Sequence, residues 1–141
     1  SLVQSVPKQE MKTLSQIEEQ LSLGKLIVSK EYKHLRGEQL KSVCEKLING
    51  GQNVNEGTRN GHRPLQMLLR RNETEAALLL IEKGADIHSS DNSGLTPFQV
   101  AVSMNNKKIA DLLISRGARK IAPPGTGYAN YYNMYLQLPP N

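Results

Sequence analysis

The stretch Asp91–Ala118 reads D-N-S-G-L-T-P-F-Q-V-A-V-S-M-N-N-K-K-I-A-D-L-L-I-S-R-G-A, and it predicts a tight turn followed by two short helices. Gly94 can adopt the positive φ that a tight turn requires. Thr96 can accept a backbone N–H at a helix start, and Pro97 suits the first helical turn, where its missing N–H has no partner to lose. Gly117 follows the second helix, where a left-handed residue commonly ends one.

Both predicted helices carry apolar residues at helical spacing. In the first these are Phe98, Ala101 and Val102, and in the second Ile109, Ala110, Leu112, Leu113 and Ile114. A short helix cannot bury such a stripe alone, so we expect copies of the unit elsewhere in the chain. A shift of 33 residues finds them: it aligns Gly61, Gly94 and Gly127, Pro64 and Pro97, Gly51, Gly84 and Gly117, and the apolar pairs that begin at Leu47, Leu80 and Leu113.

The motifs G-L-T-P-F-Q-V-A and L-L-I-S-R-G-A at this period resemble the ankyrin repeat. The resemblance is strong for Asp91–Ala118 and good for Thr58–His88, although Arg63 stands where the helix-capping Thr is expected. It weakens before Leu40 and after Ala118. The resemblance implies an all-α solenoid of stacked helix-turn-helix repeats with hairpin loops. In that family Gln66 and Gln99 would stand where a His often tethers neighbouring repeats, and an amide can also donate and accept there.

We divide the chain into an N-terminal arm with a capping helix and a repeat domain. The proposed units are 1–24 for the arm and helix, 25–57 for a degenerate repeat, 58–90 and 91–123 for two full repeats, and 124–141 for a half-repeat cap. The apolar stripe Met11, Leu14, Ile17 and Leu21 predicts a helix over Glu10–Leu23 that covers the exposed end of the stack. A partner-binding amphipathic helix is the alternative.

The two outer units depart from the repeat pattern. In the first, Tyr32 and Leu35 align with first-helix residues, but Lys30 and Glu31 replace the Thr-Pro start signal. In the tail, the shift places Tyr131, Met134 and Tyr135 on the core positions Phe98, Ala101 and Val102. We therefore interpret the tail as a cap, with a tyrosine recognition or phosphorylation segment as the alternative.

The composition describes a polar, basic chain with an aliphatic core. The sequence has 141 residues, 38% of them hydrophobic, no Trp and a single Phe, with a mean hydropathy of −0.49. Eighteen basic against thirteen acidic residues give a net charge of +5. This charge is consistent with a solvated surface, with an acidic protein partner, or, third, with nucleic acid, for which the sequence has no dense basic run or reading motif.

The sequence offers no arrangement of catalytic or metal-binding residues. His34, His62 and His88 share no helical face and no paired carboxylates stand near them. Cys44 is the only cysteine, which excludes an internal disulfide and a multi-cysteine zinc site, and it aligns with the small residues Ala77 and Ala110. We therefore predict no enzyme activity, no cofactor and no metal, and a buried structural thiol at Cys44.

The family resemblance implies a different kind of site, a concave surface formed by the hairpin tips and the exposed side of each first helix. Carried over residue by residue, the candidate partner-binding residues are Arg59, Asn60, His62, Arg70, Arg71, Asn92, Ser93, Leu95, Ser103, Met104 and Tyr128. We expect these side chains to face water in the free protein. Arginine and tyrosine are frequent binding hot spots, so the set predicts a basic strip with apolar anchors.

The sequence as a whole predicts a non-catalytic protein–protein interaction module. The expected partner is a protein with an acidic or mixed acidic-apolar surface, and the expected state is a monomer in the cytoplasm. No signal peptide or membrane span is visible. Because the chain opens with Ser1, the alternative is a regulatory or targeting segment of a larger enzyme or of a secreted microbial effector acting in a host cytosol.

Overall fold

A computed structural model describes residues 21–125 together with Tyr131 and Tyr135. The described part is helical and contains no strand. Its helices are α2 (Leu23–Ile27), α3 (Gly37–Asn49), α4 (Pro64–Arg70), α5 (Thr74–Glu82), α6 (Pro97–Ser103) and α7 (Lys107–Ser115). The expectation of an all-α chain built from helix pairs is confirmed.

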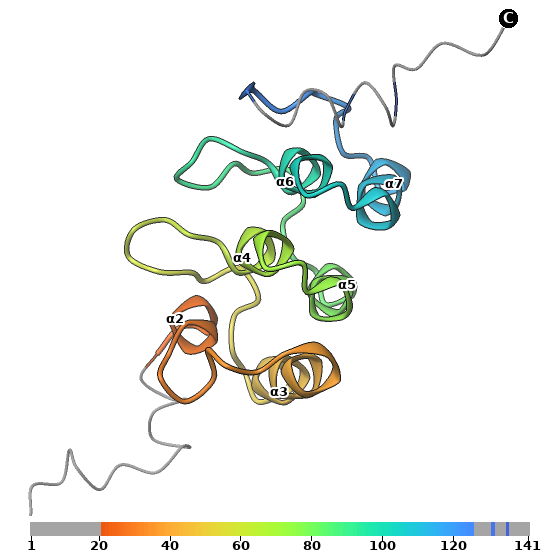
Figure 1. Cartoon of the computed structure of the whole chain (residues 1–141). Helices are drawn as coiled ribbons and strands as arrows, with labels where there is room; N and C mark the ends of the chain where they lie inside the picture. Colours follow the sequence, from red (N-terminus) through yellow and green to blue (C-terminus); the bar gives the residue numbers. More distant parts are fainter. Residues whose placement is uncertain (1–20, 126–130, 132–134, 136–141) are drawn as a thin grey trace, which may run out of the picture.

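The helices stand in two columns (Figure 1). Helices α2, α4 and α6 form one column, α3, α5 and α7 form the other, and the hairpin loops project from the side of α4 and α6 that faces away from the second column. Packing within the columns joins α3 to α5 and α4 to α6, while packing between them joins α4 to α5 and α6 to α7. Each helix pair therefore buries its apolar stripe against the next pair rather than by itself.

The third repeat has the local chemistry that its sequence predicts. Thr96 accepts the backbone N–H of Gln99 at 3.2 Å, and the Gln99 side chain accepts the N–H of Thr96 at 2.9 Å, so α6 begins with a capping box. Gly94 and Gly117 adopt φ values of 79° and 95°. Helix α4 lacks a side-chain cap, because Arg63 reaches Asp86 at 3.4 Å instead.

The first repeat differs from its prediction. Its first helix is α2, whereas Tyr32 and Leu35, which the 33-residue shift placed in that helix, lie in the turn and loop that follow it. Two local features place the helix earlier. Ser22 caps α2 by accepting the N–H of Lys25 at 3.3 Å, and Gly24 donates its N–H to the carbonyl of Glu56 at 2.9 Å. A Cβ at Gly24 would lie 2.5 Å from the Gly57 Cα, so only glycine permits this approach.

The predicted boundary between residues 24 and 25 therefore falls inside α2. The second helix of the first repeat keeps its register at one end only. Helices α3, α5 and α7 end at Asn49, Glu82 and Ser115, which are 33 residues apart, but α3 begins four residues early, at Gly37.

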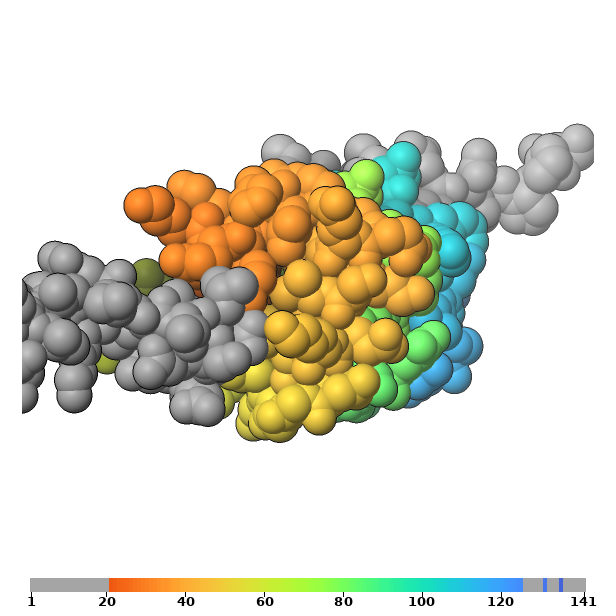
Figure 2. All heavy atoms as spheres, turned by 90° about the horizontal axis from the view of Figure 1, so that it is seen from below, coloured from red at the N-terminus to blue at the C-terminus, as the bar shows by residue number. Residues whose placement is uncertain are grey.

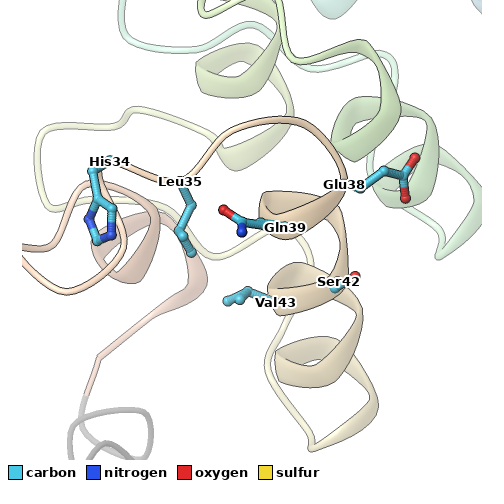
Figure 3. A pocket seen from close by; sticks show the side chains of 6 residues that line it. All are labelled: His34, Leu35, Glu38, Gln39, Ser42 and Val43. Atoms are coloured by element: carbon cyan, nitrogen blue, oxygen red, sulfur yellow. The ribbon is translucent and has the colours of Figure 1, made fainter.

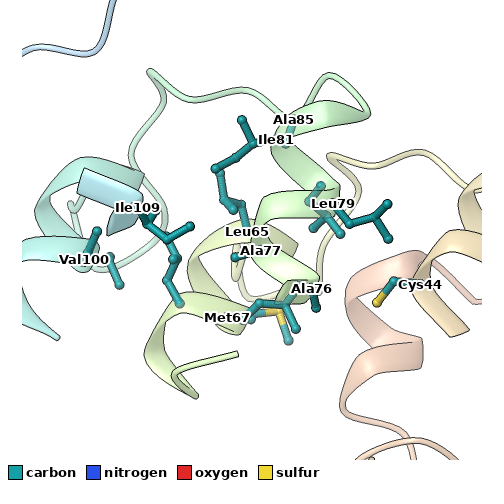
Figure 4. Packing of buried hydrophobic residues seen from close by; sticks show 14 of the residues in the cluster. Cys44, Leu65, Met67, Ala76, Ala77, Leu79, Ile81, Ala85, Val100 and Ile109 are labelled. Atoms are coloured by element: carbon teal, nitrogen blue, oxygen red, sulfur yellow. The ribbon is translucent and has the colours of Figure 1, made fainter. Parts of the chain in front are cut away.

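An aliphatic core runs the length of the stack (Figure 4). Leu80 and Leu113 are completely buried, as the repeat alignment predicts. The three aligned small residues Cys44, Ala77 and Ala110 are buried as well. Burial raises the pKa of the Cys44 thiol to about 11, which keeps it protonated and confirms its structural character.

Both described tail residues pack on the last repeat. The Tyr131 ring is 6% exposed and meets the Phe98 ring edge-on, with 6.3 Å between centroids, and its hydroxyl donates to the Lys120 carbonyl at 2.8 Å. The Tyr135 ring lies 5.6 Å from Phe98. This is the contact that the cap interpretation predicts, and Met134 lies outside the described residues. So does most of the predicted helix over Glu10–Leu23, of which only Leu21–Leu23 is described, with Leu23 beginning α2.

Candidate functional site

Two hairpin loops form the side of the stack that carries the predicted tips. In the first, Thr58 donates its N–H to the His62 carbonyl at 3.0 Å, and the N–H of His62 donates to the Thr58 hydroxyl at 3.2 Å. In the second, the N–H of Asp91 donates to the Leu95 carbonyl at 3.0 Å. The same positions of two repeats thus close both loops.

The two tips are joined. The N–H of Asn92 donates to the Gly61 carbonyl at 3.2 Å, and the loops enclose a shallow polar depression between them. Because this bond crosses from one repeat to the next, the tips form one continuous surface rather than two separate loops.

The predicted partner-binding residues have different degrees of exposure. The exposed ones are Arg59, Asn60, Asn92, Ser93 and Met104; the half-buried ones are His62, Arg70, Arg71, Leu95 and Ser103. Tyr128 lies outside the described residues. Leu95 packs against the core with part of its side chain, and Met104 keeps 37% of its surface in water. The tips and Met104 are therefore the accessible part of the predicted set.

The expectation that Arg70 and Arg71 face water freely is wrong. Arg70 forms an ion pair with Asp91, with 2.5 Å between Nη1 and Oδ2, and the Asp91 side chain is fully buried. Burial disfavours the charged carboxyl, but the bonds from Arg70 and from the backbone N–H groups of Ser93 and Leu95 outweigh it and hold the pKa of Asp91 below its usual value.

Arg71 is held by the neighbouring repeat. Its Nη2 donates to the carbonyl of Lys33 at 2.8 Å and to that of Leu35 at 3.4 Å. The guanidinium therefore ties the second repeat to the loop of the first. Sequence reasoning missed this because the first repeat does not follow the 33-residue register.

The tethering role of the two glutamines is confirmed. The Gln66 amide donates to the carbonyls of Ser89 and Leu95, at 3.0 and 3.2 Å, and the Gln99 amide donates to the Ala122 carbonyl at 3.3 Å. Each glutamine therefore fixes the loop of the following repeat against its own first helix, so the hairpins are held by hydrogen bonds at their base.

A family model of ankyrin repeats in three copies matches residues 35–123. This chain belongs to the ankyrin-repeat family. A comparison with curated protein sequences finds no match. Ankyrin repeats are a non-catalytic interaction fold and generally bind proteins. None of the helices in the described part of the chain has the length and apolar character that crossing a membrane requires.

Two polar residues that sequence reasoning missed bridge successive ankyrin repeats. Glu73 accepts the N–H of Gly37, at the start of α3, at 2.9 Å. Thirty-three residues later, Asn106 donates to the Thr74 hydroxyl at the start of α5, at 3.0 Å. Each residue follows an asparagine with positive φ, Asn72 or Asn105, and that pair of asparagines was the available signal.

The described residues of the ankyrin domain contain no group of three His, Cys, Asp or Glu residues placed to hold a metal ion. An open groove in the first repeat is lined by His34, Leu35, Glu38, Gln39, Ser42 and Val43 (Figure 3). His34 and Glu38 stand at opposite ends of this row, so the groove does not bring an acid and a base together.

The end of the stack that carries α2 and α3 forms one face of the molecule (Figure 2). The first repeat covers most of this face, and the later repeats lie behind it. The hairpin tips are thus on a different side from the groove of the first repeat.

Proposed function

We propose that this ankyrin domain binds a partner protein through a hairpin strip, which we define as Arg59, Asn60, Asn92, Ser93, Leu95 and Met104. The family supplies the class of function, and the finer assignment is supported by one observation above all. The tips are exposed, joined by the bond from Asn92 to Gly61, and fixed at their base by the glutamine tethers. A surface held in place in this way loses little conformational entropy on binding.

The chemistry of the hairpin strip favours a mixed acidic-apolar partner. Arg59 supplies a positive charge that no neighbouring carboxylate pairs within the described residues, while Leu95 and Met104 supply apolar contacts. Charge mainly speeds encounter, and buried apolar contacts mainly slow release. Arg70 and Arg71 lie beside this surface with part of each side chain exposed, but their structural bonds make them unsuitable as test positions.

We also propose that the domain acts without catalysis and works as a monomer in the cytoplasm. The one thiol of the chain is buried and protonated, and the carboxylates of Glu73, Asp86 and Asp91 are each held by bonds that join repeats or close loops, which supports the first proposal. A regulatory or targeting role within a larger enzyme or effector is the alternative, and the sequence on either side of the chain would decide it.

The test is a binding comparison between two folded variants. A partner is isolated by pull-down and identified by mass spectrometry, and its binding kinetics are then measured at two salt concentrations. Arg59→Glu should lower the association rate and its salt dependence, and Met104→Ala should raise the dissociation rate. Glu75→Lys on the exposed face of α5 is the matched control and should bind as the wild type does. Wild-type kinetics in both strip variants would show that the hairpin strip is not the site.

A further inference from the structure

The segment Arg119–Ile121 follows the last helix and inverts the pattern of the earlier repeats. At the same positions the second repeat has Asp86, Ile87 and His88, and the first has an equally alternating Asn-Val-Asn. The middle residue there is apolar and at least partly buried, and the outer two are polar. In the last repeat the outer positions are Arg and Ile and the middle one is Lys, so the apolar side chain occupies a surface position.

The polar residue at the first of these positions organises the loop in the second repeat. Asp86 accepts the N–H of His88 at 2.8 Å and the N–H and hydroxyl of Ser89 at 3.1 and 2.5 Å. Asp86 also pairs with Arg63 at 3.4 Å. Its N–H donates to the Asn55 side chain at 2.8 Å, so the inner repeats satisfy this place with their own groups.

The last repeat leaves the same place without a carboxylate. Arg119, Lys120 and Ile121 are all exposed, and Ile121 keeps 47% of its surface in water. Beside them is a small hollow lined by Ile87, His88, Thr96, Ala118, Arg119 and Ile121. Half of this lining is apolar and none of it is acidic, so an arginine and an aliphatic side chain stand together at the rim of a recess.

The chain supplies no acidic residue here. Asp111 is the last acidic residue of the sequence, and its carboxylate is bound by Lys107 at 2.7 Å and by the Tyr135 hydroxyl at 2.8 Å. Arg116 adds a further exposed positive charge next to the segment. Lys120 also lies with its Nζ 5.2 Å from the Tyr135 ring centre.

We propose that this terminal basic surface, made of His88, Arg119, Lys120 and Ile121, binds an acidic segment of another protein. A carboxylate of that segment pairs with Arg119, and an aliphatic side chain packs on Ile121 and enters the hollow. An arginine beside an exposed apolar side chain and a recess is typical of a protein-binding hot spot. Nucleic acid fits less well, because phosphate binding would use several cations and has no need for the exposed Ile121. The proposal goes beyond the hairpin strip and does not depend on it.

The repeats themselves supply the variant that tests the proposal. Arg119→Asp with Ile121→Asn introduces residue types that the inner repeats carry at these positions, Asp86 and Asn55. Because those residues fit the same loop, we expect the variant to fold and its melting temperature to stay the same or rise. The charge and the apolar contact are both removed.

The probe is a random dodecapeptide library displayed on phage and selected on the whole chain. We expect the selected peptides to be rich in Asp and Glu around an aliphatic residue, and to bind the double variant at least about tenfold more weakly, a loss of about 1.4 kcal/mol. Amide resonances of residues 88 and 118–121 should shift when such a peptide is added. Peptides without acidic enrichment, or with equal affinity for the folded variant, would overturn the proposal.

Two controls distinguish peptide binding at this surface from binding elsewhere on the chain and from binding of another class of ligand. Arg59→Ala with Met104→Ala alters the hairpin strip and should leave the peptides bound; loss of binding there would refute the terminal basic surface and favour the hairpin strip. Duplex DNA and phosphatidylserine vesicles are the second control. If either one binds the wild type but not the double variant, while no acidic peptide does, the surface contacts nucleic acid or membrane and the proposal is wrong.

Discussion

At the scale of single residues, the buried ion pair between Arg70 and Asp91 has the largest consequence. Arg70→Met leaves the Asp91 carboxylate with its two backbone donors but without its charged partner, in a site where the carboxyl side chain has no contact with water. We expect a loss of about 1–3 kcal/mol in the free energy of unfolding, measured by denaturant titration. Arg59→Met at the exposed tip is the matched control and should change stability by less than about 0.5 kcal/mol. Equal stability of the two variants would contradict the structural role of Arg70.

The same carboxyl predicts a pH dependence. Because the pKa of Asp91 is lower in the folded state than in the unfolded chain, its stabilisation is present above the ordinary pKa of an aspartate and is lost as the pH falls through the folded value. Stability should therefore decrease on acidification below about pH 4. Asp91→Asn should be less stable at neutral pH and should lose less stability over that range. Parallel pH profiles for variant and wild type would show that Asp91 does not titrate as described.

At the scale of the elements, burial between successive helix pairs decides the cost of a truncation. Leu80 and Leu113 are fully buried, so Leu80→Ala or Leu113→Ala should cost about 2–5 kcal/mol. Leu78→Ala in the same helix α5 removes the same atoms from a half-buried position and should cost less. Thermal melting measures all three variants. Three equal shifts would mean that the helix pairs do not pack as a stack.

The missing cap of α4 gives an element-scale prediction of the opposite sign. Arg63→Thr places at the start of α4 the residue that caps α6, and it should stabilise the domain by about 0.5–1.5 kcal/mol. The variant loses the Arg63–Asp86 pair, but both side chains are about one-quarter to one-third exposed, so that pair contributes little. Thr96→Arg is the reciprocal control and should destabilise. A lower melting temperature for Arg63→Thr would show that the ion pair outweighs the cap.

These elements also show what the sequence could predict. Wherever a turn glycine, a capping residue and a helix-starting proline occurred together, as around Gly94 and Thr96, the helix and its burial followed from local chemistry. The helix α2 could not be predicted in this way, because its position depends on the close approach of Gly24 to Gly57, a contact 33 residues distant in sequence. The site was predicted at the tips, where exposure follows from loop position. It was wrong for Arg70 and Arg71, because their partners belong to other repeats.

At the scale of the whole molecule, the tail closes the C-terminal end of the stack. Deleting Tyr128–Asn141 removes Tyr131 and Tyr135 from Phe98, so the truncated domain should melt at a lower temperature and aggregate. Tyr131→Ala should reproduce part of the loss, because this ring is almost completely buried. Light scattering during thermal melting measures both effects. Unchanged melting and solubility would favour the alternative, a recognition segment that the stack does not need.

The central claim is that a rigid ankyrin stack presents its hairpin strip to a protein partner, and hydrogen exchange tests it most directly. Amide exchange is measured by mass spectrometry for the free chain and for its complex with the isolated partner. We predict slower exchange in the complex at residues 58–62, 91–95 and 103–105, and no change along the outer faces of α3 and α5. Protection confined to those outer faces, with exchange at both tips unchanged, would contradict the claim.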